Sequence, residues 1–356
     1  MRPISSVLIF LAGCLLQDAR GTAFGNDTDH AARFLAGIVT PHEPSHASNP
    51  PGWWSAYARD IERRWNAFDD QKLAAARAFS RERVRSHHEL AYYMFGGPDF
   101  PFLNAFFPQA TTYVLSGLEA VEHPTQLPQR LWTGAGLQQL RKSLDTYLDL
   151  GFFRTDQMTP QQGFAGVTPL LLALIARSGN HITEATALDL GDDGIAVDHR
   201  PSSTPPGGLR ISFIDFHGKA KTLYYFQADL SDGGKGSAAL WQFCRALGHG
   251  DNLLKSASYL LHEDRFSTAR DFLLGHSRLL VQDDSGIPVR FLDRTNWELG
   301  LFGKYQAPIG RFEKYYQPEL AAMPQPGGFR AYTFRTGYLA QVGGSNYLLA
   351  KRRGDQ

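Results

Sequence analysis

The sequence is poor in three features that would narrow its function at once: net charge, cysteine and long apolar runs. Its 36 lysines and arginines against 35 aspartates and glutamates leave a net charge of +1, so the chain has no general attraction to nucleic acid or anionic lipid. The apolar run near the N-terminus, Ile4 to Leu16, is shorter than the roughly 20 residues that cross a bilayer. A hydrophobic content of 43% excludes disorder and predicts a globular body.

The first two dozen residues predict export. Arg2 gives a positive start, the apolar run follows, and Gly21-Thr22-Ala23 ends the segment with small residues, as in a signal peptide of residues 1–23. The same run contains Leu11-Ala12-Gly13-Cys14, the pattern at which a bacterial lipoprotein is cleaved and its cysteine acylated. That cleavage would limit the signal to residues 1–13, and both interpretations stay open.

The choice of cleavage site decides the localisation. Ordinary cleavage gives a periplasmic or secreted protein, whereas acylation of Cys14 gives a lipid anchor in a membrane. Leu15 is not an aspartate, which favours the outer membrane. We expect membrane contact only through that anchor, and we expect Cys244 to be a buried, inert thiol.

Residues 24–52 predict a proline-rich linker before the globular body. The run His42-Glu43-Pro44-Ser45-His46 matches the zinc-protease pattern HExxH, in which two histidines one helical turn apart bind the metal. Pro44 would break that helical turn, so we expect a spacer here. We predict that residues 53–350 form a single α/β domain, with two half-domains divided near residues 200–250 as the alternative.

The patterning of the body predicts a mixed sheet flanked by helices. Apolar residues at spacings of three and four predict one or two amphipathic helices between Trp53 and Val84. A strand over Leu90–Phe95, a short helix over Phe100–Phe107 and a strand over Thr111–Leu115 follow. Further helices are predicted over 136–150 and 168–176, further strands over 195–197, 209–214 and 222–227, and short aromatic strands or turns over 297–305, 332–334 and 347–350.

A second strand-helix-strand unit is predicted between Ser256 and Pro288. It has a strand over Ala257–Leu261, a helix over Phe266–Leu274 and a strand over Arg278–Val281. Its length is similar to that of the first unit, and both units end in a polar tip. A divergent internal duplication is therefore a hypothesis for the fold.

Polar side chains at the ends of these predicted strands form the one candidate site. Carboxylates with a histidine can hold a hard cation or divide acid and base roles, because crowded acids raise one another's pKa. If the strands are parallel neighbours, these groups project at the sheet edge where α/β proteins bind ligands. A structural role, with caps and turns, is the alternative. The candidate residues are Asp99, Glu119, His262, Asp283 and Asp284.

Two runs of the sequence resemble a family of uncharacterised bacterial exported proteins and putative lipoproteins. The first contains Gly97-Pro98-Asp99-Phe100, Phe106-Phe107-Pro108, Tyr113 and Gly117-Leu118-Glu119. The second joins Ser256–His262 to Gln282–Pro288. The resemblance spans about Trp54 to Ala350, implies export, and implies no catalytic residue or cofactor.

Two hypotheses for function follow. The first is a non-catalytic protein of the cell envelope whose α/β body binds a small molecule or another envelope component. It depends on the export signal and the near-neutral charge, and on the lack of a recognisable catalytic motif. The second is a metal-assisted hydrolase that uses the strand-end carboxylates, and the distances between those carboxylates distinguish the two.

Overall fold

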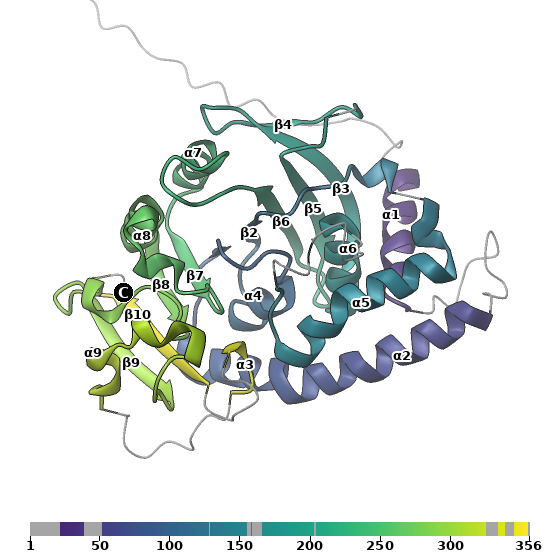
Figure 1. The fold of residues 1–356 in the computed structure, drawn as a ribbon. Helices are drawn as coiled ribbons and strands as arrows, with labels where there is room; N and C mark the ends of the chain where they lie inside the picture. Colours follow the sequence, from purple (N-terminus) through teal and green to yellow (C-terminus); the bar gives the residue numbers. More distant parts are fainter. Residues whose placement is uncertain are drawn as a thin grey trace, which may run out of the picture.

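The computed structural model describes residues 22–38, 52–127, 129–154, 158, 166–202, 204–324, 334–338 and 345–354. Within them, ten strands form one mixed sheet with helices on both faces, which confirms the α/β fold (Figure 1). The strand order is β4-β3-β5-β6-β2-β1-β7-β8-β10-β9. Strands from residues 200–250 lie inside this sheet, so the sheet itself has no break there.

Five parallel strands form the centre of the sheet. They are β6 (Ala220–Gln227), β2 (Thr112–Gly117), β1 (Leu90–Tyr93), β7 (Gly250–Leu254) and β8 (Ser277–Gln282).

Antiparallel strands extend the sheet at both sides. On the β6 side lie β5 (Gly208–Ile214), β3 (His181–Leu190) and β4 (Ala196–Asp198). On the β8 side lie β10 (Asn346–Arg352) and β9 (Trp297–Gly303).

Two layers of helices cover the sheet. One face carries α1 (Thr22–Leu35), α2 (Gly52–Phe68), α3 (Ala74–Phe79), α4 (Phe100–Phe106), α5 (Gly134–Leu150) and α6 (Val167–Arg177). The other carries α7 (Ser237–Leu247), α8 (Ser267–His276) and α9 (Pro318–Ala321). Within the described ranges, no helix has the length and apolar character that a membrane-spanning segment requires.

Alternation along the strands explains the two layers. In β1, Ala91 and Tyr93 pack into the core under α4, whereas Tyr92 packs into the core under α7 and α8. Successive side chains of a strand point to opposite faces, so a central strand covered on both sides is apolar throughout. This is why Leu90–Phe95 has a continuous apolar run.

The chain reverses its direction of travel across the sheet between β1 and β7. From β1 it crosses through α4 to β2 on one side, and from β7 it crosses through α8 to β8 on the other. Helices α4 and α8 pack into different cores, so they lie on opposite faces. The carboxyl ends of β1 and β7 therefore flank a topological switch point, where open α/β sheets bind ligands.

The predicted strand over Ala257–Leu261 is wrong. That segment is a turn followed by a short 3-10 helix, and the strand of this unit is β7, a few residues earlier. Asp251 and Asn252 interrupt the apolar pattern of β7, so the sequence does not indicate a strand there, although both side chains are buried. Asp251 accepts hydrogen bonds from Ser86 and His88, and the Asn252 amide nitrogen donates one to Ser277, so distant side chains pair with both residues.

The linker predicted over residues 24–52 is also wrong in its first part. Residues 22–35 form helix α1, in which Ala32 and Leu35 are fully buried. Asp29 fixes the helix to the sheet because its carboxylate accepts a hydrogen bond from the backbone N–H of Ile182 at 2.8 Å. The predicted signal segment up to residue 21, Cys14 and the HExxH run lie outside the described residues.

Candidate functional site

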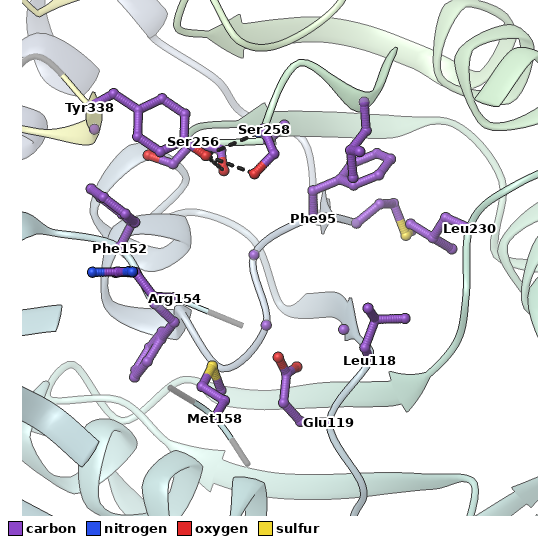
Figure 2. Close-up of a pocket in the computed structure, with 18 of the residues that line it drawn as sticks. Phe95, Leu118, Glu119, Phe152, Arg154, Met158, Leu230, Ser256, Ser258 and Tyr338 are labelled. Carbon is purple, nitrogen blue, oxygen red and sulfur yellow. Dashed lines mark hydrogen bonds between the residues drawn. The ribbon is translucent and has the colours of Figure 1, made fainter. Parts of the chain in front are cut away.

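A cavity of about 550 Å³ lies over the carboxyl ends of β6, β2, β1 and β7, at the switch point (Figure 2). This volume is typical of a small-molecule site. Apolar side chains form much of its wall, and hydroxyl, carboxylate and guanidinium groups lie among them. Its described lining includes Met94, Phe95, Gly96, Gly97, Gly117, Leu118, Glu119, Leu150, Phe152, Phe153, Arg154, Met158, Ala228, Asp229, Leu230, Ser256, Ala257, Ser258, Leu260, Phe266, Ile309, Arg311, Phe312, Gly337 and Tyr338.

The turns after β1 and β2 form one wall of the cavity. Gly97 has a φ of +55°, a conformation that glycine adopts without strain, and its N–H donates to the carbonyl of Ser116 at 3.0 Å. Gly117 has no room for a side chain, since a Cβ there would meet the Glu119 carboxylate and lie 2.7 Å from the Tyr225 hydroxyl. These two glycines let the backbones close tightly beneath Glu119.

Glu119 is the candidate carboxylate that faces the cavity (Figure 2). Its side chain is buried, and its Oε2 accepts a hydrogen bond from the Tyr225 hydroxyl at 3.1 Å. Burial raises the pKa of Glu119, and hydrogen bonds from its own backbone and from Tyr225 oppose that rise. Within the described residues it forms no ion pair, so its partners there are neutral.

Asp99 lies outside the cavity lining and caps helix α4. Its Oδ1 accepts hydrogen bonds from the N–H of Phe102 at 3.3 Å and from the Tyr147 hydroxyl at 2.7 Å. Its Oδ2 lies 2.9 Å from the Lys255 ammonium and accepts a bond from the Tyr93 hydroxyl at 3.2 Å. Burial raises the pKa of Asp99, and the Lys255 charge opposes that rise. This carboxylate is therefore fully engaged inside the protein.

The turn after β7 forms the opposite wall, and its backbone is strained. Ser256, Ser258 and Tyr259 have φ values of 54°, 53° and 56°, in the left-handed region that costs a non-glycine residue about 1–2 kcal/mol. The Asp283 carboxylate accepts the Ser256 N–H at 2.8 Å. The Tyr338 hydroxyl accepts the Ser258 N–H at 3.1 Å and donates to the Ser256 carbonyl at 2.9 Å. Side chains from distant segments thus hold the turn in place.

Asp283 and Asp284 point to different partners although they are adjacent. Asp283 holds the Ser256 turn, and burial raises its pKa. Asp284 accepts hydrogen bonds from the Tyr259 hydroxyl and from Asn346, and burial with the neighbouring Asp283 charge raises its pKa to about 7. Burial lowers the pKa of His262 to about 4, so this imidazole is neutral.

The structure therefore brings the predicted residues to one edge of the sheet but not into one site. Glu119 lines the cavity, whereas Asp99, Asp283, Asp284 and His262 lie behind its walls. Among the residues that the structure describes, no three histidine, cysteine, aspartate or glutamate side chains are placed to share a metal ion. Each of the aspartates instead has its own hydrogen-bond partners.

The sequence analysis missed most of the cavity wall. Ser258 lay in the supposed strand and Ser256 directly before it, and Arg154, Arg311 and Tyr338 lie in segments that carry no motif. The positive φ of Ser256 and Ser258 has no sequence signal, because serine seldom adopts it. Cys244 is a free, buried thiol as predicted, and burial raises its pKa.

A second, open depression lies at the opposite edge of the sheet, with His87, His88 and His249 in its lining. His88 Nδ1 lies 2.7 Å from the buried carboxylate of Asp251, so this imidazole is engaged with a side chain under the sheet edge. The depression lies away from the switch point, at the amino ends of β1, β7 and β8. We therefore place the candidate site in the cavity.

Comparison of the chain with protein-family models, with curated proteins and with solved structures found no match. The resemblance to exported proteins and lipoproteins stays a prediction. Assignment of a function thus depends on the chemistry of the cavity.

Proposed function

We propose that this protein is a non-catalytic binding protein of the cell envelope that takes a nucleoside-type ligand into the switch-point cavity. The carrying observation is Glu119, a buried carboxylate that faces the cavity and has only neutral partners among the described residues. Such a group gains most from a ligand that donates two hydrogen bonds. The vicinal hydroxyls of a ribose donate in this way.

The position of Glu119 supports a ribose. In doubly wound folds a glycine-rich turn follows the first strand, and an acidic residue about 20 positions later binds the ribose hydroxyls. Here Gly96 and Gly97 follow β1, and Glu119 follows β2, 22 positions after Gly97. The central order β6-β2-β1-β7-β8 is the order in which such folds arrange their first five strands.

The turn after β1 disfavours a phosphate. Phosphates bind to free N–H groups at a helix N-terminus, but here the N–H groups of Gly96, Gly97 and Asp99 already donate to backbone carbonyls. The Asp99 carboxylate itself caps α4, and an anion in that place repels another. We therefore infer a nucleoside without a phosphate next to its ribose, as in adenosine or S-adenosylmethionine.

The same geometry favours binding over hydrolysis. Ser256 resembles a nucleophile in its strained position after a central strand, but its Oγ is buried and has no hydrogen-bond partner among the described residues, so no base in that part of the chain contacts it. The strand-end aspartates are engaged with Lys255, Ser256 and Tyr259. No observation favours the metal-assisted hydrolase.

Calorimetric titration with adenosine, 2′-deoxyadenosine and adenosine 5′-phosphate tests this proposal. We expect adenosine to bind and 2′-deoxyadenosine to bind at least about tenfold more weakly, since one hydrogen bond to a charged group contributes about 1.5–3 kcal/mol. Adenosine 5′-phosphate should also bind at least about tenfold more weakly, because its phosphate falls at the turn that carries the Asp99 carboxylate. Glu119→Gln should weaken the binding of adenosine by a similar factor. The matched control is Glu319→Gln, an exposed glutamate on α9. Equal affinity for adenosine and its 2′-deoxy form would exclude the proposed role of Glu119.

The envelope location needs its own experiment. Export rests on the sequence of residues 1–23, and a lipid anchor rests on Cys14. Intact-mass analysis of the mature protein beside a Cys14→Ala variant separates the two cleavages. A diacylglycerol-sized addition that the variant lacks supports the anchor, whereas a mature chain that starts at Phe24 supports ordinary cleavage. A full-length cytoplasmic product contradicts both.

A further inference from the structure

The charged side chains of the cavity are separated by sign. Glu119 follows β2 and Asp229 follows β6, so the negative groups lie on the wall of the first half of the sheet. Arg154 follows α5, and Arg311 precedes Phe312, whose ring lies 4.8 Å from the Tyr259 ring in the turn after β7. A cavity with one negative and one positive wall fits a ligand that donates hydrogen bonds at one end and carries an anion at the other.

Arg311 is the group on the positive wall that is ready to bind. Its side chain is exposed, its guanidinium lies 4.8 Å from the centre of the Phe312 ring, and in the described part of the chain it forms no ion pair. Its charge also acts on Tyr338, whose pKa burial raises to about 12 and Arg311 lowers slightly. Arg311 and Tyr338 both line the cavity.

The wall beside Arg311 is held by aromatic contacts and hydrogen bonds. The Tyr338 ring lies 5.4 Å from the Phe312 ring and 5.0 Å from the Phe152 ring. The Tyr338 hydroxyl is tied to the turn after β7 through Ser256 and Ser258 (Figure 2). The planar guanidinium of Arg311, beside this wall, matches the geometry of an oxyanion.

We propose that Arg311 and the aromatic wall around Tyr338 form a second subsite, which binds an oxyanion, a carboxylate or a phosphate, carried by the ligand on a chain away from its ribose. This inference rests on the proposed function and deepens it, since it names the ligand as an acidic nucleoside derivative. An acid placed directly next to the ribose falls at the turn after β1, whereas an acid on a chain reaches the opposite wall. Arg154 adds positive charge to the same wall.

A series of 5′-thioadenosine derivatives tests the subsite with the full-length protein. Each carries an alkyl chain of two to six carbons that ends in a carboxylate, a phosphonate or the matching uncharged carboxamide. Calorimetry should show at least one chain length at which an acid binds about tenfold more tightly than its amide. The carboxylate and phosphonate arms identify which oxyanion the wall prefers. Arg311→Gln should reduce the preference to less than about threefold while the amide keeps its affinity.

Arg63→Gln is the matched control, because Arg63 is an exposed arginine on α2 that pairs with Asp60. It should leave every affinity unchanged. If amides and acids bind equally at all chain lengths, the subsite is wrong although the nucleoside site stands. An acid preference that survives Arg311→Gln also overturns the role of Arg311. If no member of the series binds, the proposed function and the subsite are both wrong.

Discussion

The ion pair between Asp99 and Lys255 gives the strongest test of how the site is held together. The Lys255 ammonium lies 2.9 Å from Asp99 Oδ2, and the two side chains are 1% exposed or less. Asp99 comes from the turn after β1 and Lys255 from the end of β7, so the pair joins the two halves of the sheet at the switch point. Asp99→Asn keeps the shape of the side chain and removes the charge.

The expected loss of stability is large because the substitution leaves a buried charge alone. In Asp99→Asn, the Lys255 ammonium keeps its hydrogen bond to the Gly151 carbonyl but loses its counter-charge. Breaking a buried pair in this way costs about 3–5 kcal/mol, and Lys255→Met should cost a similar amount. The double variant has no unpaired charge, so its loss should be smaller than the sum of the two single losses by at least about 2 kcal/mol.

Urea denaturation followed by tryptophan fluorescence measures the free energy of unfolding of the three variants and the parent. The m-values should agree, which keeps the comparison within one unfolding reaction. A loss below about 1 kcal/mol in Asp99→Asn would refute the reasoning, since that value is typical of an exposed ion pair. Strict additivity in the double variant would also refute it.

Three further predictions concern Glu122, Ser256 and Gly117. Burial raises the pKa of Glu122 from 4.5 to about 6, so its effect on stability is most favourable below pH 4.5 and is lost as the pH rises through 6. Glu122→Gln should therefore raise the free energy of unfolding by about 2 kcal/mol at pH 8 and not at pH 4, as urea titrations at both pH values can show. Ser256→Gly relieves a φ of +54° and should raise the thermal midpoint in calorimetry, for a gain of about 1 kcal/mol; an unchanged midpoint contradicts the strain. Gly117→Ala displaces the Glu119 carboxylate and should weaken adenosine at least about tenfold in calorimetric titration, and unchanged affinity would argue against that site.

The sequence predicted the first strand-helix-strand unit well because its local signals agree with the fold. The apolar run of β1, the Gly-Gly-Pro break and the β-branched start of β2 are local signals, and each predicts the structure that its own residues adopt. Asp99 was correctly placed at a strand end, and its alternative role as a helix cap is confirmed by its bond to Phe102. The parallel pairing of β1 with β2, which the sequence left as a condition, is present in the structure.

The errors arose where a distant partner changes the meaning of a residue. The strand β7 was missed because Asp251 and Asn252 are typical loop residues, and their hydrogen bonds with Ser86, His88 and Ser277 come from distant segments. Helix α1 was missed because its residues follow directly on, and at Thr22 and Ala23 overlap, the segment predicted to be an export signal. The prediction that the strand-end polar residues form one site was wrong for the same reason, since no residue near Asp99 in the sequence indicates its ion pair with Lys255. A strand-end carboxylate marks a site only when the fold leaves it without a cation.

The two strand-helix-strand units of the hypothesised duplication contact one another at the switch point. The two units lie side by side, with β1 paired to β7, and their helices lie on opposite faces. The carboxyl ends of their first strands therefore meet at the switch point, where Asp99 of the first unit neutralises Lys255 of the second. The walls that carry Glu119 and Ser256 belong to different units, and this pair fixes their separation. We thus expect Asp99→Asn to weaken the binding of adenosine by more than its unfolded fraction explains. The double variant should recover part of the free energy of unfolding but not the affinity for adenosine. Recovery of both together would mean that the pair stabilises the fold without positioning the site.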